Sequence, residues 1–364
     1  MSDVVQVNRG DLTQSRIVAQ AQPALADGWV RLSIDSFSVT ANNVTYAVVG
    51  DAFGYWNFFP GEGDWGVVPM WGHATVSQSN HPDLTAGERV YGYLPMADSL
   101  DVQPVGVTTG GFSDGAAHRQ PMSQIYNQYS RLAADPEHGP AKEAERMIFG
   151  PLFKTGFLIE AMFNRAEWFG ASALVCTSAS SKTAMATASV ARDKSPQIKR
   201  IGLTSAGNVA FVRAGGFYDQ VLAYDAIADL PQMTSVAVDF AGNAALLHQV
   251  HSALGEHLRY SCTVGATHVG AGFGRENGEL PGPKPVLFFA PDHAVAAIKD
   301  VGPKVFGATV AASWRRFLGE TQAAVRVDRR KGLAAAQAAF ADVLGGKADP
   351  AIGVIIENSQ ACTQ

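Results

Sequence analysis

The second half of the chain alternates short apolar runs with helix-like segments, and this alternation restricts the possible folds more than any other feature. Each run is short, and the segments between runs carry the apolar spacing of amphipathic helices. The runs are SALVCT (172–177), KRIGLTS (199–205), TSVAVDF (234–240), RYSCTVGATH (259–268) and PVLFFAP (285–291). Short apolar strands separated by helices are typical of a parallel sheet covered on both faces. Right-handed crossovers make such a unit doubly wound.

The first part of the chain has a different, β-rich character. WVRLSIDSFSV (29–39), ERVYGYLPM (88–96) and SLDVQPVGV (99–107) are rich in strand-forming residues, and turn signals separate them. This pattern predicts the short strands of a barrel or sandwich.

The character changes near Pro140, where helical spacing begins. AKEAERMIF (141–149) and FKTGFLIEAMFNRA (153–166) are predicted to be helical. A helix over 332–347 and a strand over 351–357 are expected at the end of the chain.

Size and composition exclude several classes of protein. A chain of 364 residues is expected to form two domains. Its formal net charge of −5 and its lack of a basic stripe argue against nucleic acid as a partner. The three cysteines form no CxxC pair, which argues against a structural zinc site and a disulfide framework. The sequence has no apolar run long enough to cross a membrane and no signal-like start, so we expect a cytoplasmic protein.

Several segments, in this order and spacing, resemble the medium-chain dehydrogenase/reductase superfamily over nearly the whole chain. They are SIDSFSVTANNVTYAVVGD (33–51), VPMWGHATV (68–76), LTAGERVYGY (84–93), FKTGFL (153–158), AVDFAGN (237–243), CTVGATH (262–268) and LGGKADPAIGVIIE (344–357). The runs at 42–60, 92–97 and 287–291 further resemble an outlying bacterial group of unknown function within that superfamily.

The resemblance implies an α/β protein with two domains. A GroES-like β-barrel-type domain that carries the catalytic residues is expected over 1–150 and 320–364. A Rossmann-like doubly wound domain that binds a dinucleotide is expected over 151–319.

The turn after the first strand of the doubly wound domain is the expected phosphate site. It reads CTSASSKTA (176–184), with Thr177, Ser180 and Thr183 near the positions where the family has glycines. A helix N-terminus offers free N–H donors to phosphate. The hydroxyls of this turn and one charge are expected to add to them, from Ser178, Ser180, Ser181, Lys182 and Thr183. The alternative is a turn with ordinary Ser and Thr caps.

The end of the second strand favours NADP(H) over NAD(H). NAD-preferring proteins place an acid there, and IGLTSAGNVAFVR (201–213) has none. Hydrogen-bond donors are expected from Thr204, Ser205 and Asn208, and positive charge for a 2′-phosphate from Arg213 or Lys182. Arg213 as a plain surface residue is the alternative. By resemblance, Thr155 lies near the nicotinamide, and Gly265 is expected at the cofactor.

The segment that resembles the zinc-binding loop of the superfamily contains no cysteine, and His73 is followed by Ala74 instead of an acid. We therefore expect no metal, and a structural or pocket role for His73. The reacting group must then be polarised by hydrogen-bond donors. Candidates are Thr40, Asn42, Asn43 and Tyr46, with Tyr46 as a general acid if its pKa is lowered, and Lys154 as a charge near the cofactor. The alternatives are that the asparagine pair caps a helix and that Lys154 is solvated.

FGYWNFFP (53–60) is unusually aromatic. Tyr55 and Trp56 are expected to form the wall of a pocket for an apolar or aromatic small-molecule substrate. The alternative is that these rings fill the core of a small barrel.

Together these features predict an NADPH-dependent, zinc-independent reductase of an activated double bond or a carbonyl, such as an enone, an enal or a quinone. Two other hypotheses remain open, a lyase or isomerase that no longer uses the cofactor and a non-catalytic nucleotide-binding protein. A homodimer is expected by resemblance, with PVLFFAP (285–291) pairing across a sheet edge.

Overall fold

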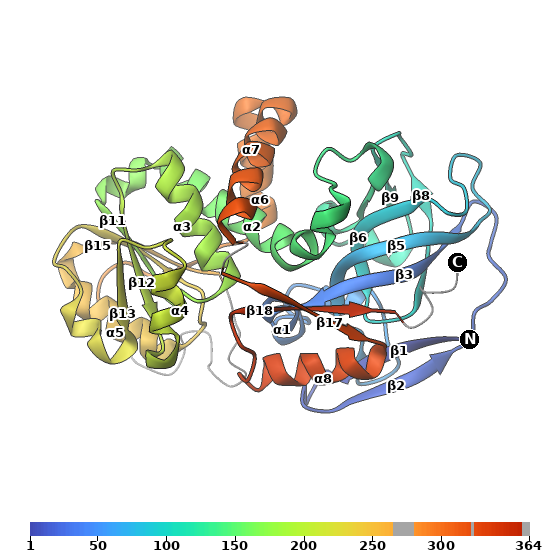
Figure 1. The fold of residues 1–364 in the computed structure, drawn as a ribbon, viewed down its shortest axis with the longest axis horizontal. Helices are drawn as coiled ribbons and strands as arrows, with labels where there is room; N and C mark the ends of the chain where they lie inside the picture. The colour runs from blue at the N-terminus through green and yellow to red at the C-terminus, as the bar shows by residue number, and fades with distance from the viewer. Residues whose placement is uncertain (265–279, 322–323, 359–364) are drawn as a thin grey trace. The chain divides into compact units, whose positions relative to one another are not determined.

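A computed structural model describes residues 1–264, 280–321 and 324–358 (Figure 1). Its contacts divide the chain into two compact units. Unit 1 comprises Met1–Ile148, Val327–Ala348 and the chain from Ile352 on, and unit 2 comprises Phe149–Arg326 and Asp349–Ala351. The assignment of a catalytic and a cofactor-binding domain with boundaries at 150 and 320 stays a prediction.

Unit 1 is built from mainly antiparallel strands. A small sheet has the order β2-β1-β4, and a larger one has the order β17-β18-β3-β5-β6-β10-β9-β8, with β7 paired to β3. The strands are β1 (Ser2–Asn8), β2 (Ser15–Gln20), β3 (Val30–Val39), β4 (Trp65–Gly66), β5 (Pro69–Ser79), β6 (Arg89–Pro95), β7 (Ser99–Val102), β8 (Pro104–Val105), β9 (Gly111–Asp114), β10 (Gln128–Arg131), β17 (Arg326–Lys331) and β18 (Ile352–Glu357).

The register of the central strands positions the side chains that matter below. His73 of β5 lies opposite Tyr91 of β6, and Trp71 lies opposite Tyr93. Residues two apart on a strand point to the same face, so these four rings share one face of the sheet. The aromatic residues therefore come together because of strand pairing and not because they are neighbours in sequence.

Two helices belong to unit 1, α1 (Ala41–Val48) and α8 (Leu333–Leu344), and they contact each other. Helix α8 buries Leu333, Ala336, Ala339 and Phe340, a spacing that places them on one face, and Gly345 caps its C-terminus. Short 3₁₀ turns are η1 (Tyr55–Asn57), η2 (Ala117–Arg119), η3 (Gln124–Tyr126), η4 (Leu132–Ala134) and η5 (Pro140–Lys142).

Unit 2 contains a parallel sheet in the order β13-β12-β11-β14-β15-β16. The strands are β11 (Ala173–Cys176), β12 (Lys199–Thr204), β13 (Gln220–Ala223), β14 (Ser235–Asp239), β15 (Leu258–Thr263) and β16 (Val286–Leu287). The helices are α2 (Glu143–Arg165, which begins in unit 1), α3 (Lys182–Lys194), α4 (Val209–Ala214), α5 (Ala244–Leu254), α6 (Ala290–Val301) and α7 (Pro303–Thr321), with the turns η6 (Glu167–Gly170), η7 (Ala206–Asn208), η8 (Tyr224–Asp229) and η9 (Gly255–His257).

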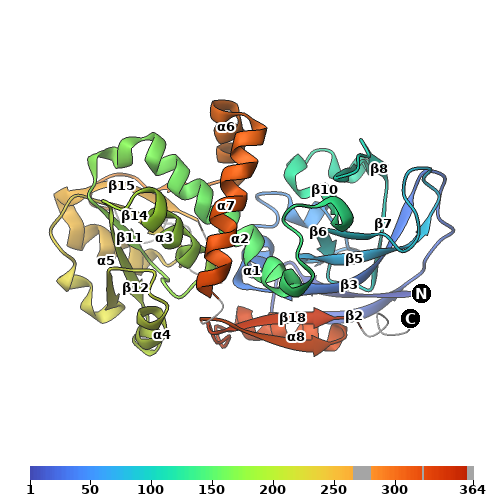
Figure 2. The same ribbon diagram turned by 45° about the horizontal axis from the view of Figure 1, so that its top comes forward.

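Alternate residues of the central strands fill two separate cores. Leu174 and Cys176 of β11 pack with residues of α2, α3 and α6, whereas Ala173 and Val175 pack with residues of α5 and η8. Figure 2 shows α3 and α5 on opposite sides of the strands. This arrangement confirms the predicted doubly wound unit, since a parallel strand that is buried on both faces has to be apolar throughout.

Two local predictions differ from the structure. The predicted helices over 141–149 and 153–166 are one helix, α2, which continues through Pro151. The strand expected over 285–291 is only two residues long, and helix α6 begins directly after Phe289 with Pro291 in its first turn. No helix in the described part of the chain has both the length and the apolar character that a membrane span requires.

Candidate functional site

The turn from β11 into α3 is held at its base by a buried hydroxyl–carboxylate contact. Thr177 is 1% exposed, and its Oγ1 donates to Oδ1 of Asp239 at 2.6 Å. The same oxygen accepts the N–H of Phe240 at 2.9 Å. Thr177 thus ties the end of β11 to the end of β14, and it is a structural anchor rather than a phosphate donor.

Ser178 then turns the chain in a conformation that normally favours glycine. Its φ is +47°, in the left-handed region, where a non-glycine residue costs roughly 1–2 kcal/mol. Its N–H donates to the hydroxyl of Tyr224 at 3.0 Å. The sequence analysis placed the glycine-like positions at Thr177, Ser180 and Thr183, whereas the left-handed backbone occurs at Ser178.

Helix α3 begins immediately after this turn. Ser181 is its N-cap and accepts the N–H of Ala184 at 3.3 Å, and Ser180 accepts a hydrogen bond from the Asn208 amide at 3.2 Å. Ser181, Lys182 and Thr183 are only partly buried. The first N–H groups of a helix have no partner within it, and the helix dipole places partial positive charge there. The turn therefore offers donors and positive potential to an anion.

Lys182 is the first residue of α3 and is held in a poorly hydrated position. Burial lowers the pKa of its ammonium group to about 8, and the carboxylate of Asp349 opposes this shift. An anion that binds beside Lys182 would favour the charged form.

The end of β12 presents small polar groups close to this turn. Ser205 is exposed, and the Asn208 amide reaches Ser180 as described. Thr204 is 1% exposed, and its hydroxyl has no hydrogen-bond partner among the described residues. Arg213 is exposed, and its guanidinium donates to the Val221 carbonyl at 3.3 Å. The Asn208 side chain thus reaches the turn, whereas the Arg213 guanidinium contacts strand β13.

A cavity of about 240 Å³ opens at the carboxyl end of β14. It is lined by Tyr224, Ala241, Asn243, Ala245, Leu246 and Gln249. Tyr224 joins the cavity to the turn, because its hydroxyl accepts the Ser178 N–H. Carboxyl ends of parallel strands are where open α/β sheets bind ligands. This cavity could not be predicted from the sequence, because its lining comes from separate segments.

Helix α2, which contains Lys154 and Thr155, crosses helix α3. Thr155 is half-buried and donates to the Pro151 carbonyl at 3.1 Å, and Lys154 is exposed. A Cβ on Gly156 would lie 2.7 Å from the Thr187 nitrogen of α3, so glycine is needed where the two helices cross. Gly265 lies outside the described residues, and its role stays a prediction.

In unit 1, the polar residues at the start of α1 bond to one another. Oδ1 of Asn43 accepts the Thr40 N–H at 2.6 Å, and its Nδ2 donates to the Pro69 carbonyl at 2.9 Å. Asn43 is 2% exposed. These contacts cap the helix, which was the alternative to a catalytic role, and they correct the expectation that Asn43 is available as a donor to substrate.

Four tyrosines and a tryptophan, which we call the tyrosine cluster, pack beside α1. They are Tyr46, Tyr55, Trp71, Tyr93 and Tyr126. The hydroxyls of Tyr55 and Tyr126 lie 3.0 Å apart, and Trp71 Nε1 donates to the Tyr46 hydroxyl at 3.1 Å. Tyr126 is half-buried and was not predicted as a site residue, because it comes from a distant segment.

The condition attached to Tyr46 as a general acid is not met. Burial, followed by the charge of Tyr55, raises the pKa of the Tyr46 hydroxyl, and the same cause raises those of Tyr55 and Tyr126. A buried phenol keeps its proton and acts as a hydrogen-bond donor. Tyr46 is therefore a neutral hydrogen-bond donor and not the general acid that the sequence suggested.

Trp56 is a packing residue and not part of a pocket wall. It is 4% exposed and fills the space over two glycines, since a Cβ on Gly50 or Gly66 would lie 2.2 Å or 2.4 Å from its ring. The alternative that aromatic residues fill the core is thus correct for Trp56. Tyr55, in contrast, lies within the tyrosine cluster.

His73 faces a polar cluster on the same sheet face. It is fully buried, and neither ring nitrogen has a hydrogen-bond partner in the described chain. Burial lowers the pKa of its ring to about 3, so the imidazole is neutral. Potential ligand atoms of His73, His138 and Glu143 all lie within 4.8 Å of one another. In the sequence His73 has no neighbouring ligand-type residue, because His138 and Glu143 follow much later in the chain.

Comparisons with known proteins agree with this architecture. The family model described as "Protein of unknown function (DUF2855)" matches residues 37–349. No curated protein sequence matches the chain.

Among solved structures, CurA from Vibrio vulnificus in complex with NADPH aligns with a TM-score of 0.63 at 14% identity, over 98% of this chain and 99% of that chain. The yhdH oxidoreductase from Salmonella enterica in complex with NADP aligns with a TM-score of 0.53 at 14% identity, over 98% and 99%. The CurK enoyl reductase aligns with a TM-score of 0.56 at 10% identity, over 98% and 99%. These likenesses confirm the fold, a GroES-like unit with a Rossmann-like unit.

Proposed function

Because this chain belongs to the family described as Protein of unknown function (DUF2855), its activity has to be inferred from its own residues, and we propose that it is an NADPH-dependent reductase. The substrate class that we propose is an activated double bond or a carbonyl, as in enones, enals and quinones. The observation that carries the proposal is the turn from Ser178 to Thr183, which combines a helix N-terminus, hydroxyls and Lys182 in one place.

The choice of cofactor follows from charge. Phosphates favour the N-terminus of α3 and the ammonium of Lys182. The segment after β12 has no acid that would repel a 2′-phosphate, and Ser205 and Asn208 offer donors there. CurA and the yhdH oxidoreductase, which share the fold, were solved with NADPH and NADP. We propose the same class of cofactor here, with the cavity beside Tyr224 as part of its site.

The proposed chemistry is hydride transfer without a metal at the reacting atoms. NADPH, held by the turn from Ser178 to Thr183, would supply a hydride to a carbon conjugated with a carbonyl, and water would supply the proton. Neutral donors stabilise the developing oxyanion. We propose the paired hydroxyls of Tyr55 and Tyr126 for this, with Thr40 and Tyr46 supporting them and Thr155 and Lys154 at the cofactor.

The test is NADPH oxidation by the purified full-length protein against enones, enals, quinones and aldehydes. We expect substrate-dependent loss of reduced nicotinamide with NADPH and much less with NADH. Binding of NADPH without turnover of any member of the panel would favour a non-catalytic nucleotide-binding protein. Absence of nucleotide binding would favour a lyase or isomerase and would contradict the proposal.

We also propose a homodimer formed through strand β16. Val286 and Leu287 are 48% and 46% exposed, and β16 ends the order of the sheet in the described chain. An exposed apolar edge strand is a ready partner for a second copy. Light scattering of the wild-type chain is expected to give the mass of a dimer, and a monomer would contradict this.

A further inference from the structure

His73 is the most unusual buried polar group in unit 1. Its side chain is fully enclosed, yet both ring nitrogens lack a hydrogen-bond partner among the described residues. A neutral imidazole carries one N–H donor and one acceptor, and leaving either unpaired in the interior costs roughly 1–3 kcal/mol. A residue with this cost needs a compensating partner.

Two further ligand-type side chains face His73. The His138 ring centroid lies 6.5 Å from that of His73, and its Nδ1 is also buried without a partner in the described chain. Nε2 of His138 lies 3.7 Å from Oε1 of Glu143. The side chains of His138 and Glu143 are 15% and 18% exposed. Two imidazoles and one carboxylate thus converge on one enclosed point.

We propose that His73, His138 and Glu143 form a binding site for one divalent cation of the zinc type. Imidazole and carboxylate ligands suit Zn²⁺, and three protein ligands leave one tetrahedral position for a water molecule. In a tetrahedral zinc site the ligand atoms lie about 3.3 Å apart. The ligand atoms now lie within 4.8 Å of one another, so metal binding requires them to move closer by about 1.5 Å.

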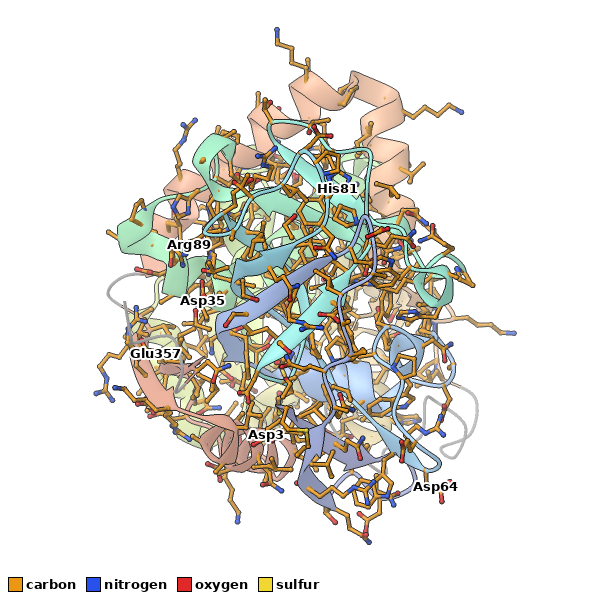
Figure 3. The ribbon with its side chains drawn as sticks, turned by 90° about the vertical axis from the view of Figure 1, so that its right-hand side faces the viewer. Asp3, Asp35, Asp64, His81, Arg89 and Glu357 are labelled. Atoms are coloured by element: carbon orange, nitrogen blue, oxygen red, sulfur yellow. The ribbon has the colours of Figure 1, made fainter. Side chains whose placement is uncertain are left out.

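The two guanidiniums near the cluster are both paired with carboxylates. Arg89 donates to both oxygens of Glu143 at 2.7 and 3.0 Å. Its Nε lies 3.3 Å from Oδ2 of Asp35, and Figure 3 labels both residues. Arg146 pairs with Asp135. The carboxylates of Asp35, Asp135 and Glu143 therefore offset the charge of these two guanidiniums, which by themselves oppose positive charge at His73. Each carboxylate oxygen has a second lone pair, so Glu143 can bind Arg89 and a metal at once.

The site is distinct from the residues proposed for reduction. It rests on β5, the segment before α2 and the first turn of α2, all of which belong to unit 1. We infer a structural role, in which the cation fastens His138 and the start of α2 to the sheet. The inference does not depend on the proposed reductase activity.

The experiment is a titration of chelator-treated full-length protein with Co²⁺, followed by the visible spectrum, and with Zn²⁺, followed by calorimetry. We expect one tight equivalent per chain, and a higher melting temperature with Zn²⁺ but not with Mg²⁺. His138→Ala and Glu143→Gln are expected to weaken Zn²⁺ binding by at least about tenfold.

Matched controls are His257→Ala, a histidine in unit 2, and Glu145→Gln, the next acid on α2, which pairs with Lys142 instead. Both are expected to bind Zn²⁺ as the wild type does. His138 is partly exposed, so its variant is expected to fold even if a His73 variant does not. Absence of a tight equivalent, or equal binding by His138→Ala and the controls, would overturn the proposal.

Discussion

Two polar segments at helix starts, Thr40–Tyr46 in unit 1 and Thr177–Thr183 in unit 2, look alike in sequence and differ in structure. In the first, Asn43 is buried and both ends of its amide bond to the chain, and the Tyr46 hydroxyl accepts from Trp71. In the second, Thr177 is buried and anchors the turn, while Ser181, Lys182 and Thr183 stay partly accessible.

The two segments differ in whether their hydrogen-bond donors are already bonded within the protein, and this decides which segment can bind a ligand. A donor that is already bonded inside the protein stabilises the fold and has little left to offer a ligand. A helix N-terminus that is capped only once keeps free N–H groups. We therefore place recognition of the cofactor phosphates at the second segment, whereas the first packs and its Thr40 and Tyr46 only support the hydroxyls of Tyr55 and Tyr126.

The largest expected effect tests whether the tyrosine cluster is truly internal. Burial raises the pKa of all nine tyrosines of the chain, that of Tyr129 to about 12. A raised folded-state pKa means that stability is complete below the unfolded value near pH 10 and is lost as the pH rises. Each fully buried tyrosine then contributes a loss of about 1.4 kcal/mol per pH unit.

An alkaline titration checks this prediction by following tyrosinate absorbance and circular dichroism together. Ionisation is expected to coincide with unfolding. If several tyrosines ionised near pH 10 while the dichroism stayed native, the cluster would be more accessible than described, and the contrast between the two segments would fail.

The next effect concerns the anchor of the second segment. Thr177→Val removes a hydroxyl that donates to the buried Asp239 carboxylate and accepts the Phe240 N–H. We expect unfolding in urea to show a loss of about 2–3 kcal/mol, the usual value for a hydrogen bond to a charged group. Thr187→Val is the control, since the Thr187 hydroxyl only bonds back to the Thr183 carbonyl of its own helix. Equal losses in the two variants would show that Thr177 is no anchor.

A smaller effect is expected in the pH dependence of NADPH binding, which tests the role of Lys182. Its pKa of about 8 means that the ammonium loses its charge as the pH rises through that value, so the dissociation constant for NADPH is expected to increase above about pH 8. Lys182→Met should weaken binding by about tenfold at neutral pH and remove this pH dependence. Lys194→Met, at the opposite end of α3, is the control. A wild-type affinity that is flat from neutral pH upward would remove Lys182 from the phosphate site.

The smallest effect concerns the backbone of the turn. Ser178→Gly is expected to stabilise the protein by about 0.5 kcal/mol, because glycine relieves the left-handed strain at some cost in chain entropy. Ser180→Gly, which changes a serine that lacks a positive φ, should destabilise it by about the same amount. Thermal unfolding of both variants measures the difference, and the same sign for both would argue against strain at Ser178.

Much of unit 2 could be predicted because its strands are apolar on both faces and its helices have caps. The runs at 172–177, 199–205 and 234–240 correspond to β11, β12 and β14, and the Ser181 cap marks α3. The PVLFFAP run was predicted to be one strand, but it forms a two-residue strand and the start of α6. Local pattern does not separate these two outcomes.

The candidate site was harder to predict, because partners distant in sequence decide what each residue does. Asn43 became a cap through Pro69, and Trp56 became a core residue through Gly50 and Gly66. The sequence around Tyr126 and His138 gives no indication of a functional role. Their contacts, such as Tyr55 and His73, come from distant segments of the chain. Contact with the rest of the fold, and not residue type, separates a functional side chain from a structural one.

Phosphate recognition at the turn from Ser178 to Thr183 can be tested by the affinity of the full-length protein for NADPH and for NADH, followed by nicotinamide fluorescence near neutral pH. We expect saturable NADPH binding that is at least about tenfold tighter than NADH binding, since only NADPH carries a 2′-phosphate. Absence of binding, or a preference for NADH, would contradict the assignment of the turn from Ser178 to Thr183 as a phosphate site.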